Sequence, residues 1–270
     1  MSHADLRGAS ADALAALRDQ LDGVGDSDAA RVGEDLFGVA RVLRSEPGLR
    51  RVATDLSTDA SAKSGLIRGI FEGKLSDQAL DLVADAVERR WTRTRDLADA
   101  LEHLGVVSVV ESAGDDSDRL SDELYAVAGL VNDQGDLRTA LSDPARSAED
   151  KGRLLGDLLR GKTLAATSRL VEQALAGSHR NLVAAIEEYQ KIAADAHGQR
   201  VAEVRVAQEL SDDEVERLRS ALSTQYGKTV HLNLVVDPTI IGGMRVEIGD
   251  DVIDGTVSSK LDEARRRLAG

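Results

Sequence analysis

The sequence predicts a mainly α-helical protein with a small α+β domain at its carboxyl end, arranged as two tandem helical bundles followed by a β-α-β-β-α unit. Three observations lead to this fold class. Apolar residues recur three and four positions apart from about residue 4 to residue 196, which is typical of amphipathic helices. One sequence pattern within this stretch occurs twice. After residue 197 apolar and polar residues alternate, which is typical of strands.

The composition indicates a folded protein and excludes several kinds of partner and site. Of the 270 residues, 42% are hydrophobic and 30% charged, which is the balance of a globular chain. The net charge of −14 disfavours polyanionic partners, so we expect no nucleic acid. The chain has no cysteine, which excludes disulfides and cysteine-based zinc sites. No segment approaches the roughly 20 apolar residues of a membrane span, so we expect no direct membrane insertion.

An internal repeat covers the helical part. An ungapped offset of 88 residues carries Leu49-Arg50 onto Leu137-Arg138 and Gly73-Lys74 onto Gly161-Lys162. The same offset aligns the apolar positions of two helices, namely Leu66, Ile67, Ile70 and Phe71 with Leu154, Leu155, Leu158 and Leu159, and Leu82, Val83, Ala86 and Val87 with Leu170, Val171, Ala174 and Leu175. Because one offset aligns helix breakers as well as apolar stripes, it predicts two copies of one bundle.

These copies give the first two predicted domains, residues 1–93 and residues 94–197, packed end to end. The repeat predicts that Leu66 and Leu154 occupy equivalent core positions, and that Leu82 and Leu170 do the same. Trp91 is the only tryptophan. It is either an anchor for a partner helix or a residue buried between the two bundles.

Residues 198–270 form the third predicted domain. Alternation at Ala202, Val204 and Val206 indicates a strand. Ser211 to Glu214 has the pattern of a capping box and begins a helix that runs to about Tyr226. Two further strands follow over 230–236 and 244–248, and an extended run resumes at 252–253 after a turn. The closing helix is predicted from the spacing of Val257, Leu261, Ala264 and Leu268.

The third domain also carries a family resemblance. Residues 230–250 read VHLNLVVDPTIIGGMRVEIGD, and Val252 to Val257 continue as VIDGTV. This stretch resembles the signature of the ATP synthase delta subunit, whose mitochondrial relative is the oligomycin-sensitivity-conferring protein. The helical segments 121–131 and 137–151, with Asp143-Pro144, resemble the helical domain of that family. The resemblance covers about 96–270, and the extra amino-terminal copy resembles actinobacterial delta subunits.

The resemblance implies a function in F-type ATP synthase. It implies a non-catalytic stator subunit of the peripheral stalk, located at the cytoplasmic face of the cell membrane as a peripheral part of the proton-translocating complex. The helical domain would hold the amino-terminal helices of alpha subunits, and the carboxy-terminal domain would meet the b-type stalk subunits. Rotor torque would then drive ATP synthesis instead of turning the catalytic head. The resemblance implies no catalytic residue, cofactor or metal.

The partner-binding residues follow from the same resemblance. We expect an apolar groove between the first and fifth helices of the second bundle to receive an alpha-subunit helix. In this sequence the groove falls on Leu101, Leu104, Val171 and Leu175. A helix lying in a groove needs anchors at such spacings, but the spacing of core residues is the same.

One motif in the sequence is typical of an enzyme and gives an alternative function. Residues 156–163 read GDLLRGKT and match the phosphate-loop pattern, which would make Lys162 and Thr163 part of a nucleotide hydrolase. The motif follows a helix-capping pattern at Ser147 rather than a strand, so a helix ending at Gly161 is the simpler interpretation. The histidines show no metal-ligand spacing. A generic helical adaptor is the third alternative.

Overall fold

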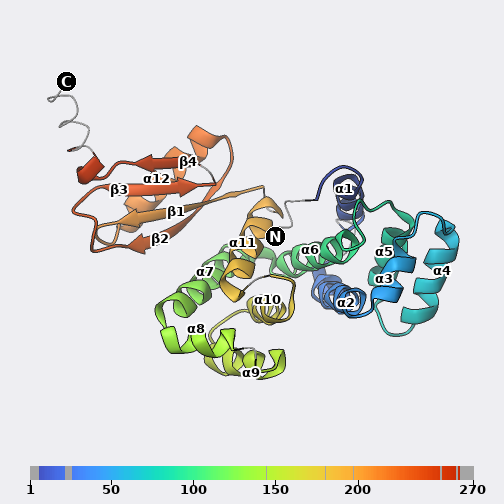
Figure 1. The fold of residues 1–270 in the computed structure, drawn as a ribbon. Coiled ribbons are helices and arrows are strands. Elements are labelled where there is room, and N and C mark those ends of the chain that lie inside the picture. Colours follow the sequence, from blue (N-terminus) through green and yellow to red (C-terminus); the bar gives the residue numbers. More distant parts are fainter. Residues whose placement is uncertain are drawn as a thin grey trace. The chain divides into compact units, whose positions relative to one another are not determined.

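The structure, a computed structural model, describes residues 6–21, 26–143, 145–179, 181–196, 198–249, 251–259 and 261. The chain divides into two compact units, Met1–Ala193 and Ala194–Gly270. The first is helical and the second carries the sheet (Figure 1). The predicted fold class, mainly α with a small α+β part at the carboxyl end, is confirmed.

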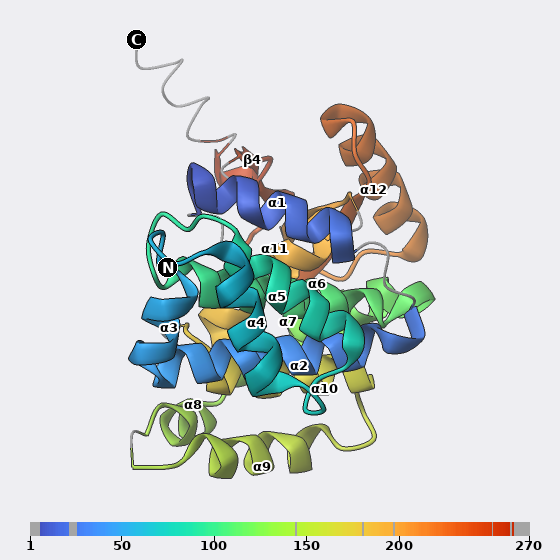
Figure 2. The same cartoon turned by 90° about the vertical axis from the view of Figure 1, so that its right-hand side faces the viewer.

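The helices of the first unit follow the predicted breakers. They are α1 (Ala9–Leu21), α2 (Asp26–Ser45), α3 (Pro47–Ala53), α4 (Ala60–Phe71), α5 (Asp77–Glu88), α6 (Asp96–Glu111), the 3-10 helix η2 (Gly114–Asp116), α7 (Ser117–Asp133), α8 (Gly135–Ser142), α9 (Ala148–Leu159), α10 (Ala165–Ala176) and α11 (Leu182–Ala196). In Figure 1, α6 lies between α1 to α5 and α7 to α10. Turned by 90°, the view in Figure 2 shows α8 and α9 together at one edge.

The bounds of the helices agree with the 88-residue repeat. It carries α4 onto α9 and α5 onto α10 residue for residue. Gly73 and Gly161, which follow α4 and α9, both have a φ of 72°. The offset also carries α1 onto α6 and α6 onto α11, so α6 belongs to both copies: it is the last helix of the first and the first helix of the second. The assignment of 1–93 and 94–197 as separate domains stays a prediction.

Polar contacts recur with the repeat. Asp35 on α2 accepts a hydrogen bond from the amide of Ser76, and Glu123 on α7 accepts one from the amide of Leu164, each at 2.7 Å. These amides begin α5 and α10, so each repeat places a carboxylate at the positive end of its fifth helix. Arg50 similarly donates to carbonyls at the end of α2, as Arg138 does at the end of α7. The aligned residues therefore specify helix ends as well as helix interiors.

The apolar core agrees with one predicted equivalence and corrects the other. Leu82 and Leu170 are both buried, as predicted. Leu66 is 41% exposed and Leu154 is half-buried, so their prediction as core positions is wrong. In α4 the buried stripe is Lys63, Ser64, Ile67 and Phe71, with Leu155 and Leu159 at the equivalent positions of α9. Leu66 lies beside that stripe because successive helix residues point about 100° apart.

Two glycines allow α2 and α6 to approach closely. A Cβ at Gly33 would lie 2.8 Å from the carbonyl oxygen of Gly105, and a Cβ at Gly105 would lie 2.6 Å from the ring of Phe37. Along the same contact, Ser108 donates from Oγ to the carbonyl of Ala29 at 2.7 Å. The absence of side-chain atoms at both glycines lets the two helix backbones meet.

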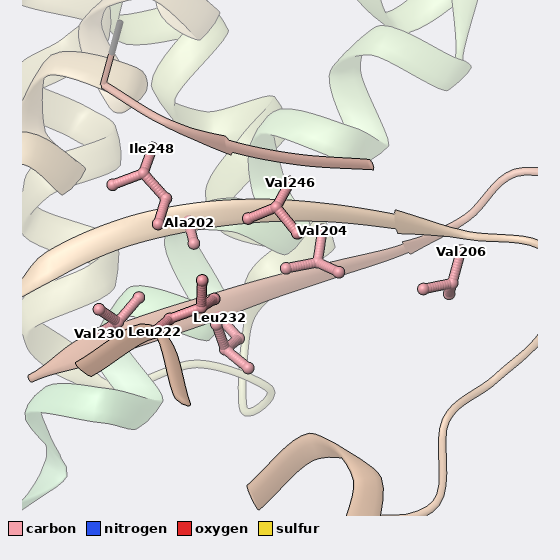
Figure 3. Close-up of a cluster of buried hydrophobic side chains, with 8 residues drawn as sticks. All are labelled: Ala202, Val204, Val206, Leu222, Val230, Leu232, Val246 and Ile248. Atoms are coloured by element: carbon pink, nitrogen blue, oxygen red, sulfur yellow. The ribbon is translucent and has the colours of Figure 1, made fainter. Parts of the chain in front are cut away.

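The second unit contains β1 (Arg200–Val206), α12 (Asp212–Tyr226), β2 (Val230–Val236), β3 (Met244–Ile248) and β4 (Asp251–Asp254). The sheet order is β2-β1-β3-β4; β1 and β2 are parallel, and the other pairs are antiparallel. Figure 3 shows the apolar cluster of this unit, to which α12 contributes Leu222. The predicted strands, helix and capping box are confirmed, and β4 adds a strand to the predicted unit. Residues 257–259 and 261 are helical, whereas the rest of the predicted closing helix, with Ala264 and Leu268, lies outside the described residues.

Candidate partner-binding surfaces

Two glycines in the family signature bring two loops of the second unit together. The amide of Gly255 donates to the carbonyl of Met244, and the amide of Val257 donates to that of Gly242, both at 2.9 Å. Gly243 has a φ of 84°, and a Cβ there would lie 2.4 Å from the carbonyl oxygen of Gly255. This position needs glycine for its left-handed backbone and for the close approach of the other loop.

An aspartate begins each of these loops in the same way. Asp237 accepts hydrogen bonds from the amide and hydroxyl of Thr239, and Asp254 accepts them from the amide and hydroxyl of Thr256. In both cases the hydroxyl and amide hydrogen bonds hold the pKa of the carboxyl below its ordinary value of 3.8, because they stabilise the charged form.

Exposed apolar side chains lie in these loops and in the segments next to them in the sequence. Ile241 is 80% exposed, and it precedes the glycine pair that contacts Val257. We define the C-terminal apolar surface as Ile241, Val252, Ile253, Val257 and Leu261, all of which are exposed. Exposed apolar residues that form a patch typically mark a binding surface, so these five residues are candidates for one. The glycine loops hold one part of this surface and the edge strand β4 carries another.

The structure places the four predicted groove residues on two adjacent helices, and most of them lie in the core. Leu101 and Leu104 lie on α6, and Val171 lies on the adjacent α10; all three are almost completely buried. Leu175, one turn further along α10, is half-buried. Of the four, only Leu175 offers substantial surface to a partner. Binding of an alpha-subunit helix at these residues stays a prediction.

Leu175 lines a cavity that the sequence does not reveal. This cavity, the second-repeat pocket, has a volume of about 470 Å³ and lies among the ends of α7 to α11. Its walls include Val131, Leu141, Lys151, Leu175, His179 and Ala184. A larger hollow of about 650 Å³ lies between α2 and the pair α9 and α10, with charges of both signs around it. The pocket residues come from five helices, so no local pattern identifies them.

A buried carboxylate joins helices of both repeats beside this region. Glu102 on α6 accepts hydrogen bonds from Arg44 at 2.5 Å, from Gln173 at 2.8 Å and from the hydroxyl of Tyr189 at 3.1 Å. Burial raises the pKa of Tyr189 well above its ordinary value, and the nearby negative charge of Glu102 raises it further. The Glu102 network therefore links α2, α6, α10 and α11. Its members are separated by tens of residues in the sequence.

The phosphate-loop motif at residues 156–163 lies at the end of a helix. Gly156 lies within α9, and Gly161 follows the helix end with a positive φ, as the helix interpretation predicted. The amide of Lys162 donates to the carbonyl of Leu159, so this backbone does not have the form of a phosphate-binding loop after a strand. Among the described residues, no group of three His, Asp or Glu side chains could hold a metal ion, and no helix is long and apolar enough to cross a membrane.

Trp91 is buried within the first repeat. It is 6% exposed, and its Nε1 donates to the carbonyl of Ala86 at 2.8 Å. Because its side chain is buried, Trp91 is not available in this structure as an anchor for a partner helix, the first of the two alternatives. It instead caps the last turn of α5, the helix that it follows.

Known proteins similar to this chain agree with the family signature. The family model described as "ATP synthase delta (OSCP) subunit" matches residues 106–268. A protein of Nocardioides sp. named ATP synthase subunit delta is 59% identical over 98% of both chains. Proteins of the same name from Streptomyces griseus subsp. griseus, at 38% identity over 98% of this chain and 100% of the relative, and Kineococcus radiotolerans, at 43% over 90% of each, are also similar.

A chain of the cryo-EM structure of the Toxoplasma gondii mitochondrial ATP synthase hexamer has a TM-score of 0.34 and 16% identity, covering 61% of this chain and 96% of that chain. The family model covers more than half of the sequence, and the relatives extend over both repeats. The chain belongs to the ATP synthase delta (OSCP) subunit family.

Proposed function

We propose that this delta subunit is a non-catalytic stator of F-type ATP synthase, which links the catalytic head to the b-type subunits of the peripheral stalk. Under this proposal it resists the torque of the rotor, so that rotation drives ATP synthesis by a proton-translocating complex. The chain would lie at the cytoplasmic face of the cell membrane, attached only through its partners. Membership of the family, over almost the whole chain, is the observation that carries the proposal.

The helical unit is proposed to bind the head through the amino-terminal helices of alpha subunits. Its construction suits a part under mechanical load, because α6 belongs to both repeats and the Glu102 network joins helices from each. Hydrogen bonds from Arg44, Gln173 and Tyr189 to this one buried carboxylate hold the four helices together. Leu175 is the predicted groove residue with accessible surface.

The second unit is proposed to bind the b-type subunits through the C-terminal apolar surface. Ile241 is the most exposed large apolar residue of that surface, and solvation of such a side chain is unfavourable until a partner covers it. The adjacent loops are held by backbone hydrogen bonds at Gly242 and Gly255. A preorganised apolar surface loses little conformational entropy on binding.

A binding measurement with Ile241→Asp tests this assignment. We expect the variant to bind the soluble part of the b-type subunit at least about tenfold more weakly, because a charge would be buried at an apolar contact. Its binding to the catalytic head should remain unchanged. The matched control is Leu56→Asp, since Leu56 is 61% exposed and belongs to the helical unit. Unchanged b-subunit affinity in Ile241→Asp would contradict the proposed stalk surface.

The nucleotide hydrolase alternative makes a different prediction. It requires Lys162 to contact phosphate, yet the surrounding residues form the end of a helix. Under the stator proposal, calorimetry with magnesium and ATP detects no binding to the isolated chain. Micromolar binding that Lys162→Ala abolishes would favour the hydrolase.

A further inference from the structure

In the first repeat, a tryptophan side chain occupies the space at the end of the fifth helix. Trp91 lies three residues after α5, and its indole nitrogen donates to the carbonyl of Ala86, the third residue from the end of that helix. Three residues of this repeat correspond, at the 88-residue offset, to residues that line the second-repeat pocket, and all three are closed to solvent: Thr54 is 8% exposed, Lys63 4% and Val87 0%.

The second repeat has the same helices but a smaller side chain at this position. The 88-residue offset carries Trp91 onto His179, whose ring lies edge-on to Tyr189 with centroids 5.6 Å apart. The residues equivalent to Thr54, Lys63 and Val87 are more accessible: Ser142 is exposed, and Lys151 and Leu175 are half-buried. These three residues and His179 line the second-repeat pocket. The positions of the pocket lining are therefore closed in the repeat that carries Trp91 and open in the repeat that carries His179.

The size and the lining of this pocket suit the binding of one side chain from a partner protein. Its volume of about 470 Å³ lies within the range of roughly 300–1,000 Å³ in which proteins bind small molecules. Apolar wall atoms come from Val131, Leu141 and Leu175. Ala174, the equivalent of Ala86, also lines the pocket and stands third from the end of α10. Its carbonyl is the counterpart of the acceptor that Trp91 uses.

The charges around the pocket differ in sign from the chain as a whole. The pocket lining contains two cationic side chains, Arg138 and Lys151, but only one carboxylate, Glu187. The fourth titratable residue of the lining, His179, adds no negative charge. The complete chain has a net charge of −14. A local excess of cations on an acidic protein favours a partner with carboxylates at this point.

We propose that the second-repeat pocket binds one aromatic side chain, presented by an acidic segment of a partner protein. The ring occupies the space that corresponds to Trp91, and an indole donor reaches the carbonyl of Ala174. Carboxylates beside the aromatic residue meet Arg138 and Lys151. Aromatic residues are frequent anchors in interfaces because they bury a large rigid surface.

Small probes test this proposal on the complete chain. Indole-3-propionate carries an indole and a carboxylate, and we expect it to shift the amide resonances of Ser142, Leu175 and Ala184 saturably at millimolar concentration. Cyclohexanepropionate lacks the aromatic ring and tryptamine carries the opposite charge, so both should bind at least about threefold more weakly. If cyclohexanepropionate bound as tightly as indole-3-propionate, the preference for an aromatic ring would be overturned. If tryptamine bound more tightly than indole-3-propionate, the preference for an acidic partner would be overturned.

Variants then test where the probe binds. His179→Trp places the first repeat's residue in the second, so we expect it to fill the pocket, abolish the indole-3-propionate shifts and raise the melting temperature by about 2–4 °C. Ala184→Leu narrows the pocket from α11 and should weaken probe binding as well. Ala126→Trp adds an exposed tryptophan on α7 and should leave binding unchanged. Undiminished binding to both pocket variants would overturn the assignment. This inference does not rest on the stator role, which copurification with head and stalk subunits tests separately.

Discussion

Gly243 and Gly249 have the same sign of φ but different surroundings. Gly243, at 84°, faces the carbonyl of Gly255, whereas Gly249, at 60°, has open space where a Cβ would stand. We expect Gly243→Ala to destabilise the second unit by about 3 kcal/mol, because a steric clash adds to the cost of a left-handed residue. Gly249→Ala should cost only about 1 kcal/mol. Denaturant unfolding compares the two, and equal losses would contradict the close loop contact.

The paired aspartates make the second unit sensitive to acid. Because the folded pKa values of Asp237 and Asp254 lie below 3.8, their contribution to stability is complete above that pH and is lost as the pH falls through the folded values. We expect Asp254→Asn, which keeps an acceptor oxygen but cannot titrate, to lose less stability than the wild-type chain between pH 5 and about pH 2. Hydrogen exchange of β3 and β4 measures this difference. The control is Glu209→Gln, which also replaces an exposed carboxylate of the second unit by its amide.

At the scale of elements, the contact between α2 and α6 depends on glycine at one position of α2 and not at another. Gly33 faces the backbone of α6, whereas Gly38 on the same helix has open space around it. We expect Gly33→Ala to destabilise the first unit by about 2 kcal/mol, because the helices must move apart. Gly38→Ala should stabilise it by about 0.5–1 kcal/mol, since alanine favours the helix. Thermal melts of the two variants measure these changes. Shifts of the two melting temperatures in the same direction would contradict the close contact between α2 and α6 at Gly33.

The elements themselves could be predicted from the sequence because their signals are local. The periodicity of α4 and α9, the capping box of α12 and the alternation of β2 each lie within a few residues. The partners of these elements are not local. Spacing alone could not show that Leu101, Leu104 and Val171 are core rather than groove, because both kinds of residue lie on the apolar face of a helix.

The second-repeat pocket and the Glu102 network were beyond prediction for the same reason. Glu102 stands between Leu101 and His103 in a largely apolar helix, and its partners Gln173 and Tyr189 lie 71 and 87 residues away. The repeat did contain one usable signal, since it aligns Trp91 with His179. A large residue aligned with a smaller one at a buried position indicates an unfilled space.

At the scale of the whole molecule, the Glu102 network makes the two repeats dependent on each other. Replacing the carboxylate in Glu102→Ala leaves Arg44, Gln173 and Tyr189 without this acceptor. We expect a loss of about 3 kcal/mol, because removing one member of a buried polar network leaves its partners unsatisfied. Glu149→Ala, an exposed position on α9, should change stability by less than about 0.5 kcal/mol. Urea unfolding measures the stability of both variants, and a small effect of Glu102→Ala would contradict the proposed contribution of the Glu102 network.

The central claim is that the chain links two partners through two different units. Copurification with a chain that ends at residue 197 tests it most directly, because this truncation leaves the helical unit, Met1–Ala193, and removes the sheet. We predict that the truncated chain still binds the catalytic head and no longer captures the b-type stalk subunits. Capture of the b-type subunits at full affinity by the truncated chain would contradict the account.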